Sequence, residues 1–308
     1  MNQEAVCWLK NEIKKRYGNV KRARGIYLYT EKGVRLTDCY LDGGRGILGH
    51  GGGKAKTAFK DCFERGANGF YDSGLLPAFE KSVKKLLPAE YTEIRLYSEK
   101  TAAMLGETSF SSKCSQKKAS AVSEQTSCVL ENTQKNTEPV LWRPLIDFAG
   151  KITEQPTGYP KIEVVYNVTG DFPAIVKIVP PFTYATDISV YAFSKACGEE
   201  MLQNLPKNDV VPSPLLAAYT RGFYDLLNSF SLFTENHFKA NSKALEPFFT
   251  RNQCYLFPKI PETQYKDFVL KCLEAGIVIS PDYNEPSIIP WRANPGDIKK
   301  ISKITLEE

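Results

Sequence analysis

The alternation of short apolar runs with amphipathic helical patterns is the feature that most constrains how this chain of 308 residues folds. Four of the runs are rich in Val, Ile and Tyr, and several lack the alternating polar positions of a half-exposed strand. Helical periodicities lie before and after them, which predicts an α/β protein with a mixed or parallel sheet. The four predicted strands are PVLWRPLIDF (139–148), IEVVYNV (162–168), AIVKIV (174–179) and ISVYAF (188–193).

The chain begins with an amphipathic helical pattern over residues 4–16. A basic stretch follows up to Arg24, and it is either a solvated helix end or a phosphate-contacting patch. Residues 25–42 then form a predicted β-hairpin with a polar turn at 31–33, and a glycine-rich stretch leads into the next helix. The remaining predicted elements are helices over 54–65, 77–87, 214–233, 263–275 and 295–303, and strands over 254–260 and 277–280.

Residues 106–138 differ in composition from the rest of the chain. They contain mainly Ser, Lys, Gln, Thr and Asn, with almost no side chain that a core could bury. Because such a segment cannot offset the entropy lost when its backbone becomes ordered, we expect a mobile polar insertion at this position.

Composition and charge exclude several classes of protein. Lys and Arg number 40 and Asp and Glu 35, so the net charge of +5 is too small and too dispersed to predict nucleic-acid binding. No apolar run approaches the roughly 20 residues of a membrane span, and the N-terminus lacks the pattern of a signal peptide. The eight cysteines include no C-x-x-C pair and only two histidines accompany them, so we expect reduced thiols and no metal site. These features predict a cytoplasmic protein without a nucleic-acid or membrane partner.

The loop Gly44–Gly49 satisfies the G-x-G-x-x-G pattern of dinucleotide-binding proteins, in which the glycines let a pyrophosphate approach a helix N-terminus. The run before it is polar at alternate positions, whereas the first strand of a dinucleotide-binding unit is normally apolar throughout. A nucleotide-binding oxidoreductase is therefore one alternative for the function, and it depends on this loop alone.

A longer pattern surrounds that loop. The sequence from Arg22 to His50 reads RARGIYLYTEKGVRLTDCYLDGGRGILGH, and it resembles the opening of the class III aminotransferases. Residues 210–227 are similar to the helix that follows the cofactor lysine in that family, and residues 265–281 are similar to its C-terminal small domain. The resemblance implies the α/β fold of the pyridoxal-phosphate-dependent transferases, aminotransferase fold type I, in a shortened and divergent member.

The resemblance also implies the organisation and the partners of the chain. Residues 1–85 would contribute an N-terminal segment to a small domain, and residues 236–308 would form its C-terminal part. Residues 86–235 would form a reduced large domain that binds the cofactor and contains the polar insertion. Proteins of this family use pyridoxal 5'-phosphate (PLP) to transfer amino groups between small molecules, so the resemblance implies PLP, an amino donor and acceptor, and a homodimer.

One lysine is the candidate for catalysis. Residues 186–198, TDISVYAFSKACG, resemble the family's segment around the lysine that forms a Schiff base with PLP. On that register Lys195 is the Schiff-base lysine and the proton shuttle of amino-group transfer. Apolar neighbours such as Phe193 and Ala196 predict an apolar pocket around its amine, and a surface position for Lys195 is the alternative.

The resemblance suggests roles for four further residues. Ser98 and Thr101 are the candidate donors to the cofactor phosphate, because hydroxyl and backbone N–H groups at a helix N-terminus bind phosphate. Asp187 is a candidate for the acid that keeps the pyridine nitrogen protonated. Arg292 is the candidate for binding a substrate carboxylate through two parallel hydrogen bonds.

The middle of the chain departs from the family. The strand 174–179 carries no acid at the end where the pyridine-binding Asp belongs, and Asp171 and Asp187 are off-register substitutes. The phosphate-binding turn at 96–102 lacks a glycine and contains Glu99. Two further functions therefore stay open. The protein is either an aminotransferase with weak or absent activity that holds PLP through its lysine, or a degenerate relative that keeps the fold and acts as a binding or interaction protein.

Overall fold

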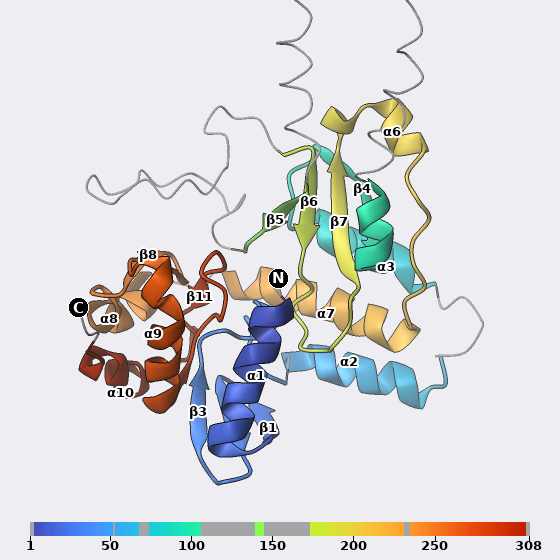
Figure 1. The fold of residues 1–308 in the computed structure, drawn as a ribbon. Helices are drawn as coiled ribbons and strands as arrows, with labels where there is room; N and C mark the ends of the chain where they lie inside the picture. The colour runs from blue at the N-terminus through green and yellow to red at the C-terminus, as the bar shows by residue number, and fades with distance from the viewer. Residues whose placement is uncertain are drawn as a thin grey trace, which may run out of the picture. The chain divides into compact units, whose positions relative to one another are not determined.

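The computed structural model describes residues 3–51, 53–67, 74–105, 139–144, 173–230 and 235–305. Three sequence predictions lie outside these residues, namely the polar insertion over 106–138, the strand over 162–168 and the role of Asp171. The chain forms two compact units, whose elements are labelled in Figure 1. Unit 1 contains residues 1–60, 181–184 and 221–308, and unit 2 contains residues 61–180 and 185–220. The domain boundaries after residues 85 and 235 stay predictions.

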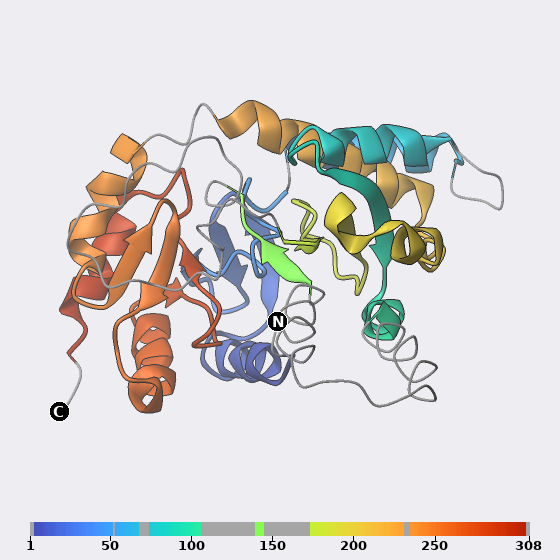
Figure 2. The same ribbon diagram turned by 90° about the horizontal axis from the view of Figure 1, so that it is seen from above.

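The first sheet of unit 1 joins the two ends of the chain. Its strands, in order, are β1 (Val20–Arg24), β2 (Tyr27–Thr30), β3 (Arg35–Asp38) and β10 (Ile277–Val278). β2 pairs antiparallel with β1 and with β3, which includes the hairpin that the sequence predicts, whereas β10 pairs parallel with β3. The N-terminal hairpin and the C-terminal tail therefore lie side by side (Figure 2).

The edge strand β1 explains the basic stretch near the N-terminus. Helix α1 (Gln3–Tyr17) ends before this stretch is complete, and the remaining basic residues belong to β1, whose five residues are all exposed. Lys21, Arg22 and Arg24 place positive charge along the edge of the sheet, which disfavours pairing with a strand from another chain. The stretch is thus part helix end and part edge strand.

The tail of unit 1 packs through an amphipathic helix, α9 (Glu262–Glu274). Five of its side chains are buried with the three- and four-residue spacing of one helix face. They are Tyr265, Phe268, Val269, Cys272 and Leu273. The other tail elements are α8 (Glu235–Leu245), β8 (Phe249–Asn252), β9 (Tyr255–Pro258), β11 (Ser287–Ile288), α10 (Pro295–Ile298) and the 3-10 helix η3 (Lys299–Lys303). The strands β8, β9 and β11 form a three-stranded antiparallel sheet.

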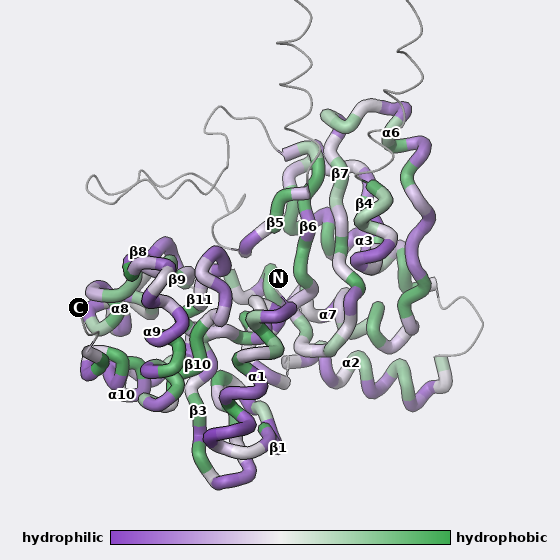
Figure 3. Tube along the Cα trace, viewed as in Figure 1, coloured by the Kyte–Doolittle hydropathy of each residue, from purple (hydrophilic) through white to green (hydrophobic). Residues whose placement is uncertain are grey.

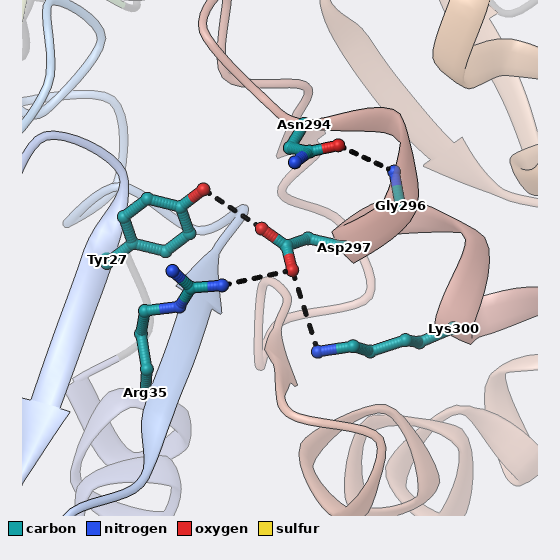
Figure 4. Close-up of polar contacts among 6 residues, drawn as sticks. All are labelled: Tyr27, Arg35, Asn294, Gly296, Asp297 and Lys300. Carbon is teal, nitrogen blue, oxygen red and sulfur yellow. Dashed lines mark hydrogen bonds and ion pairs between the residues drawn. The ribbon is translucent and has the colours of Figure 1, made fainter.

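A buried carboxylate links the tail to the hairpin. Asp297 in α10 accepts a hydrogen bond from the Tyr27 hydroxyl of β2 at 2.9 Å (Figure 4). Its other oxygen lies 3.3 Å from a guanidinium nitrogen of Arg35, in β3, and 3.7 Å from Lys300 Nζ. Burial, together with this hydrogen bond, raises the pKa of Tyr27. The contact fixes α10 against two strands of the hairpin.

Unit 2 is built on a four-stranded mixed sheet in the order β4 (Tyr91–Tyr97), β7 (Ser189–Ser194), β6 (Ile175–Ile178) and β5 (Val140–Trp142). β7 pairs antiparallel with both of its neighbours, and β5 and β6 pair parallel. All six residues of β7 are buried, as expected for a strand covered on both faces. β6 is mainly hydrophobic apart from Lys177 (Figure 3). The side chain of Tyr97 packs against Tyr191 and Phe193 in the core.

The predicted helices over 54–65, 77–87 and 214–233 are present to within a few residues, whereas the sequence predicted no helix over 195–203 or 235–245. Unit 2 also contains α3 (Leu75–Lys84), the 3-10 helix η1 (Lys195–Cys197) and α6 (Glu199–Gln203). The chain passes from one unit to the other within α2 (Gly53–Glu64) and α7 (Ser213–Ser229). Within the described ranges, no helix has both the length and the apolar character that crossing a membrane requires.

The dinucleotide-binding alternative does not match the topology. The loop Gly44–Gly49 follows β3, and the next strand that the structure describes after α2 is β4, which belongs to a different sheet. A dinucleotide-binding unit needs these two strands parallel within one sheet, with the helix between them. The loop therefore does not belong to a dinucleotide-binding unit, which removes the observation on which the prediction of a nucleotide-binding oxidoreductase depended.

Candidate functional site

The antiparallel pairing of β4 with β7 separates residues that the sequence places in one cofactor site. Ser194, the last residue of β7, pairs with the first residue of β4, and Ser189, the first residue of β7, pairs with the last. Lys195 therefore lies beside the start of β4, whereas Ser98 lies just beyond its end. At about 3.4 Å per residue, the six residues of β7 put these two positions about 20 Å apart.

Lys195 lies in η1, directly after β7, and is exposed. Its backbone N–H donates to the Glu90 carbonyl at 3.0 Å, which continues the strand pairing by one residue. Ser194 Oγ accepts from the Ala196 N–H and so caps the turn that follows. The chain leaves the buried sheet at this turn. The apolar pocket predicted around the lysine amine is therefore not formed among the described residues.

Ser98 and Thr101 lie at the start of a helical segment over residues 99–105, but a carboxylate of the chain itself is their partner. The Ser98 N–H donates to Asp209 Oδ2 at 2.7 Å. Hydrogen bonds from the Ser98 backbone and the Thr101 side chain lower the pKa of Asp209. The Ser98 hydroxyl is 3.2 Å from Thr101 Oγ1. An internal anion thus takes the donors that the resemblance implies for a phosphate.

Asp187 and Arg292 are both exposed. Asp187 lies two residues before β7, at the same end of the sheet as Ser98. Arg292 belongs to unit 1, where its guanidinium carbon lies 4.5 Å from the centre of the Trp291 ring. The structure brings Asp187 to the sheet end of Ser98 and Thr101, but it does not bring Lys195 there.

These positions decide whether the residues fit PLP. A single cofactor would have to reach Lys195 with its aldehyde and Ser98 with its phosphate, across the length of β7. Asp209 adds a charge of the same sign as the phosphate at the second position. The residues that the sequence suggested for the cofactor therefore do not fit it as one site.

A second polar cluster lies in unit 1, on residues that carry the sequence resemblance. His50 Nε2 is 2.7 Å from Asp38 Oδ2, with 9% of the histidine side chain and 4% of the aspartate side chain exposed. Asp38 Oδ1 accepts hydrogen bonds from the N–H groups of Tyr40 and Leu41, both at 2.9 Å. These bonds hold the loop after β3, in which Leu41 and Asp42 adopt the left-handed conformation with φ of 50° and 53°.

Glycine lets this loop close on the hairpin. Gly25 and His50 exchange two backbone hydrogen bonds, of 3.0 and 2.6 Å. A Cβ at Gly49, whose φ is 90°, would lie 3.2 Å from the Gly25 carbonyl oxygen. Local structure thus explains the Gly-His pair that ends the resembling pattern. Gly49 allows the loop to approach the Gly25 backbone closely, and the His50 side chain contacts Asp38.

A pocket of about 510 Å³ is lined in part by this cluster. Helix α1 and the N-terminal hairpin contribute most of the other lining residues. The lining residues from the cluster and its loop are Asp38, Tyr40, Asp42 and His50, and the apolar ones include Val6, Leu9, Ile13, Val20, Ala23 and Leu28. All of them belong to unit 1.

Two side chains of the pocket are in unusual electrostatic surroundings. The Tyr40 hydroxyl is buried and has no hydrogen-bond partner in the part of the chain that the structure describes. Burial, and then the negative charges of Glu285, Asp42 and Asp38, raise the pKa of Tyr40 well above its usual value. Burial also raises the pKa of Asp42, against the opposing effect of Arg45. In the described part of the chain, no three His, Cys, Asp or Glu side chains could together hold a metal ion.

The sequence alone did not single out this cluster. Asp38 and His50 entered only as letters of the resembling pattern, because 12 residues separate them and no known catalytic spacing joins them. The available signal was an aspartate at the end of a strand, followed by a glycine-rich loop that ends in one of only two histidines.

Comparison with known proteins places the fold. No protein-family model matches the chain. The sequence is 26% identical over 330 residues to an uncharacterized protein of Treponema pallidum (strain Nichols), and the match covers 91% of both chains. Ornithine aminotransferase from Plasmodium yoelii superposes with a TM-score of 0.57 at 15% identity, over 97% of each chain.

Two other solved structures are similar in the same way. Acetylornithine aminotransferase from Elizabethkingia anophelis has a TM-score of 0.57 at 14% identity, over 97% of this chain and 98% of that one. A transaminase with PLP bound has a TM-score of 0.59 at 11% identity, over 98% of this chain and 96% of that one. The chain therefore has the α/β fold of the PLP-dependent aminotransferases, and the predicted fold class is confirmed. At these identities the likeness concerns the fold alone.

Proposed function

We propose that this protein keeps the aminotransferase fold without PLP catalysis and acts as a binding protein. The register of β4 and β7 carries the proposal, because it puts Lys195 and Ser98 at opposite ends of the strand pair. Transamination requires that the aldehyde and the phosphate of one cofactor be held together in a fixed geometry.

The surroundings of the other residues support the same function. Ser98 and Thr101 already donate to Asp209, so a phosphate would have to displace a carboxylate of the chain. Asp187 is exposed, whereas an acid that keeps a pyridine nitrogen protonated acts best in a water-excluded site. Each residue thus has a structural explanation that needs no cofactor.

An active aminotransferase is the second candidate, and the fold favours it. The similar solved structures include a transaminase with PLP bound. In that case the protein would bind PLP, exchange amino groups between small molecules and form a homodimer, with Arg292 as the candidate partner of a substrate carboxylate.

Borohydride reduction after incubation with PLP distinguishes the two candidates. Exposed lysines are largely protonated at neutral pH and react slowly with aldehydes. We expect mass spectrometry to find no more label on Lys195 than on Lys207, an exposed lysine of the same unit. The matched variants Lys195→Ala and Lys207→Ala should lower the total label equally.

The opposite result is equally clear. One label per chain concentrated on Lys195, a yellow protein before reduction, and loss of both in Lys195→Ala but not in Lys207→Ala would establish Lys195 as the Schiff-base residue. Transamination of any amino acid by the same preparation would then make the protein an enzyme.

A further inference from the structure

We propose that the pocket between α1 and the N-terminal hairpin binds a small primary amine with an apolar tail, its ammonium group held by Asp42 and the Tyr40 hydroxyl. The inference deepens the proposed function, on which it rests for its biological role, by naming a class of ligand. The site itself belongs to unit 1 alone. Its test is therefore separate from the reaction of Lys195, in unit 2, with PLP.

The size and the apolar walls of the pocket suit a small organic molecule. Its volume of about 510 Å³ is typical of small-molecule sites. Val6, Leu9 and Ile13 line it from α1, Val20 lines it from β1 and Leu28 from β2. Each CH2 group of a ligand that these side chains cover should strengthen binding about four-fold.

The unpaired Tyr40 hydroxyl indicates where the polar group of a ligand binds. Tyr40 lines the pocket and is 7% exposed, and its buried hydroxyl has no hydrogen-bond partner among the described residues. Buried hydroxyls are nearly always hydrogen-bonded, because an unpaired one loses the bond that it would make with water. The phenol oxygen can accept a hydrogen bond from a ligand N–H group.

The charges around this hydroxyl favour a cation. Three carboxylates, those of Glu285, Asp42 and Asp38, act on Tyr40, and Arg45 opposes them. Both oxygens of Asp38 are already bonded, to His50 and to two backbone N–H groups.

Asp42 is the carboxylate that remains for the ligand. Its side chain makes no hydrogen bond or ion pair with any residue that the structure describes, while the guanidinium of Arg45 donates to the Tyr184 carbonyl at 3.1 Å. Arg45, His50 and Lys10 act on Asp42 only at longer range, so an ammonium ion would give it a direct ion pair and hydrogen bond.

Two exposed lysines of α1 define the main competing ligand. Lys10 and Lys14 also line the pocket, and they could attract a carboxylate instead. Lysines that stay hydrated at a surface contribute little to binding, whereas Asp42 lies in surroundings whose burial already disfavours its charge. The geometry thus favours the amine, and a carboxylate of equal length is the necessary comparison.

Titration of the full-length protein with three six-carbon probes tests the inference. Hexylamine, 1-hexanol and hexanoate share one alkyl chain and differ in charge. We expect calorimetry or ligand-observed NMR to give hexylamine an affinity about five-fold higher than that of 1-hexanol, with hexanoate weakest. Butylamine, which is two CH2 groups shorter, should bind about fifteen-fold more weakly than hexylamine.

Two variants locate the site. Asp42→Asn removes the charge, and asparagine tolerates the left-handed backbone at this position, so the affinity for hexylamine should fall to that for 1-hexanol. Tyr40→Phe removes the acceptor oxygen and should weaken hexylamine about three-fold or more. The matched control Asp267→Asn, on the exposed face of α9, should change nothing. Thermal unfolding of each variant verifies that it is folded.

Several results would overturn the inference. Hexanoate binding as tightly as hexylamine would assign the pocket to anions held by Lys10 and Lys14. An unchanged affinity for hexylamine in both Asp42→Asn and Tyr40→Phe would place the amine elsewhere. Failure of the amine to bind at all would remove the ligand class and leave the proposed loss of PLP catalysis untouched.

Discussion

The loop after β3 in unit 1 and the turn after β4 in unit 2 are both polar ends of buried strands, but their polar groups are satisfied differently. At the turn after β4, Ser98 and Thr101 donate to Asp209, so a group of the same chain satisfies the donors. At the loop after β3, Asp38 and His50 satisfy each other, yet the neighbouring Tyr40 hydroxyl has no partner within the described ranges.

The difference separates a structural cluster from a candidate binding site. A donor set that already has an internal anion gains little from an external one, whereas a buried group without a partner gains a full hydrogen bond when a ligand arrives. The residues that resemble a phosphate site are thus closed by the chain. The residues of the loop after β3 contribute carboxylates and a buried, unpaired hydroxyl to the pocket that they line.

Removal of the buried aspartate that holds the loop after β3 should have the largest effect. Asp38→Ala leaves His50 and the N–H groups of Tyr40 and Leu41 without their acceptor. We expect the free energy of unfolding, measured by urea denaturation, to fall by about 3–5 kcal/mol. Asp267→Ala, at an exposed position, should change it by no more than about 0.5 kcal/mol. Equal stabilities of the two variants would show that the loop does not depend on Asp38.

Removal of the internal anion at the turn after β4 should have a smaller and pH-dependent effect. The pKa of Asp209 is lowered in the folded protein, so its contribution is present above its usual pKa of 3.8 and is lost as the pH falls through the lowered pKa. Asp209→Ala should therefore lower the free energy of unfolding by about 1 kcal/mol at pH 7. Denaturation at successive pH values between 6 and 2 should show the difference from wild type shrinking, and a constant difference would contradict the assignment.

Substitution of Asp42 should have the smallest effect on the free energy of unfolding, and it should raise that free energy and not lower it. Burial raises the pKa of Asp42, so its ionised form costs stability at neutral pH, and the cost disappears as the pH falls below the usual pKa of 3.8. We expect Asp42→Asn to raise the free energy of unfolding at pH 7 by about 0.5 kcal/mol or less and to change nothing near pH 3. Calorimetric unfolding at both pH values measures this gain. A loss of stability at pH 7 would show that the Asp42 carboxylate has a stabilising partner in the folded chain, as the Asp209 carboxylate does.

Local patterns determined much of the fold. The hairpin within residues 25–42, the helix α9 and the fully buried strand β7 follow from turn residues, apolar periodicity and β-branched content, which depend on neighbours a few positions away. The resemblance over residues 22–50 added the fold class that the solved structures confirm. Packing of the hairpin against the tail was expected as well, because neither the hairpin nor the tail's short strands can bury an apolar face alone.

The candidate site was decided by tertiary structure. The sequence around Lys195 resembles a segment of the family, but such a resemblance does not state whether its strand runs parallel or antiparallel to the next. That direction sets which sheet end the lysine occupies. Asp209 and Ser98 are 111 positions apart in the sequence, so no local pattern predicts their hydrogen bond. The missing partner of Tyr40 is a property of everything packed around its hydroxyl. Sequence determines what each residue can do chemically, and only the folded chain determines which groups meet, because hydrogen bonding and charge act over a few ångströms of space and not over positions along the chain.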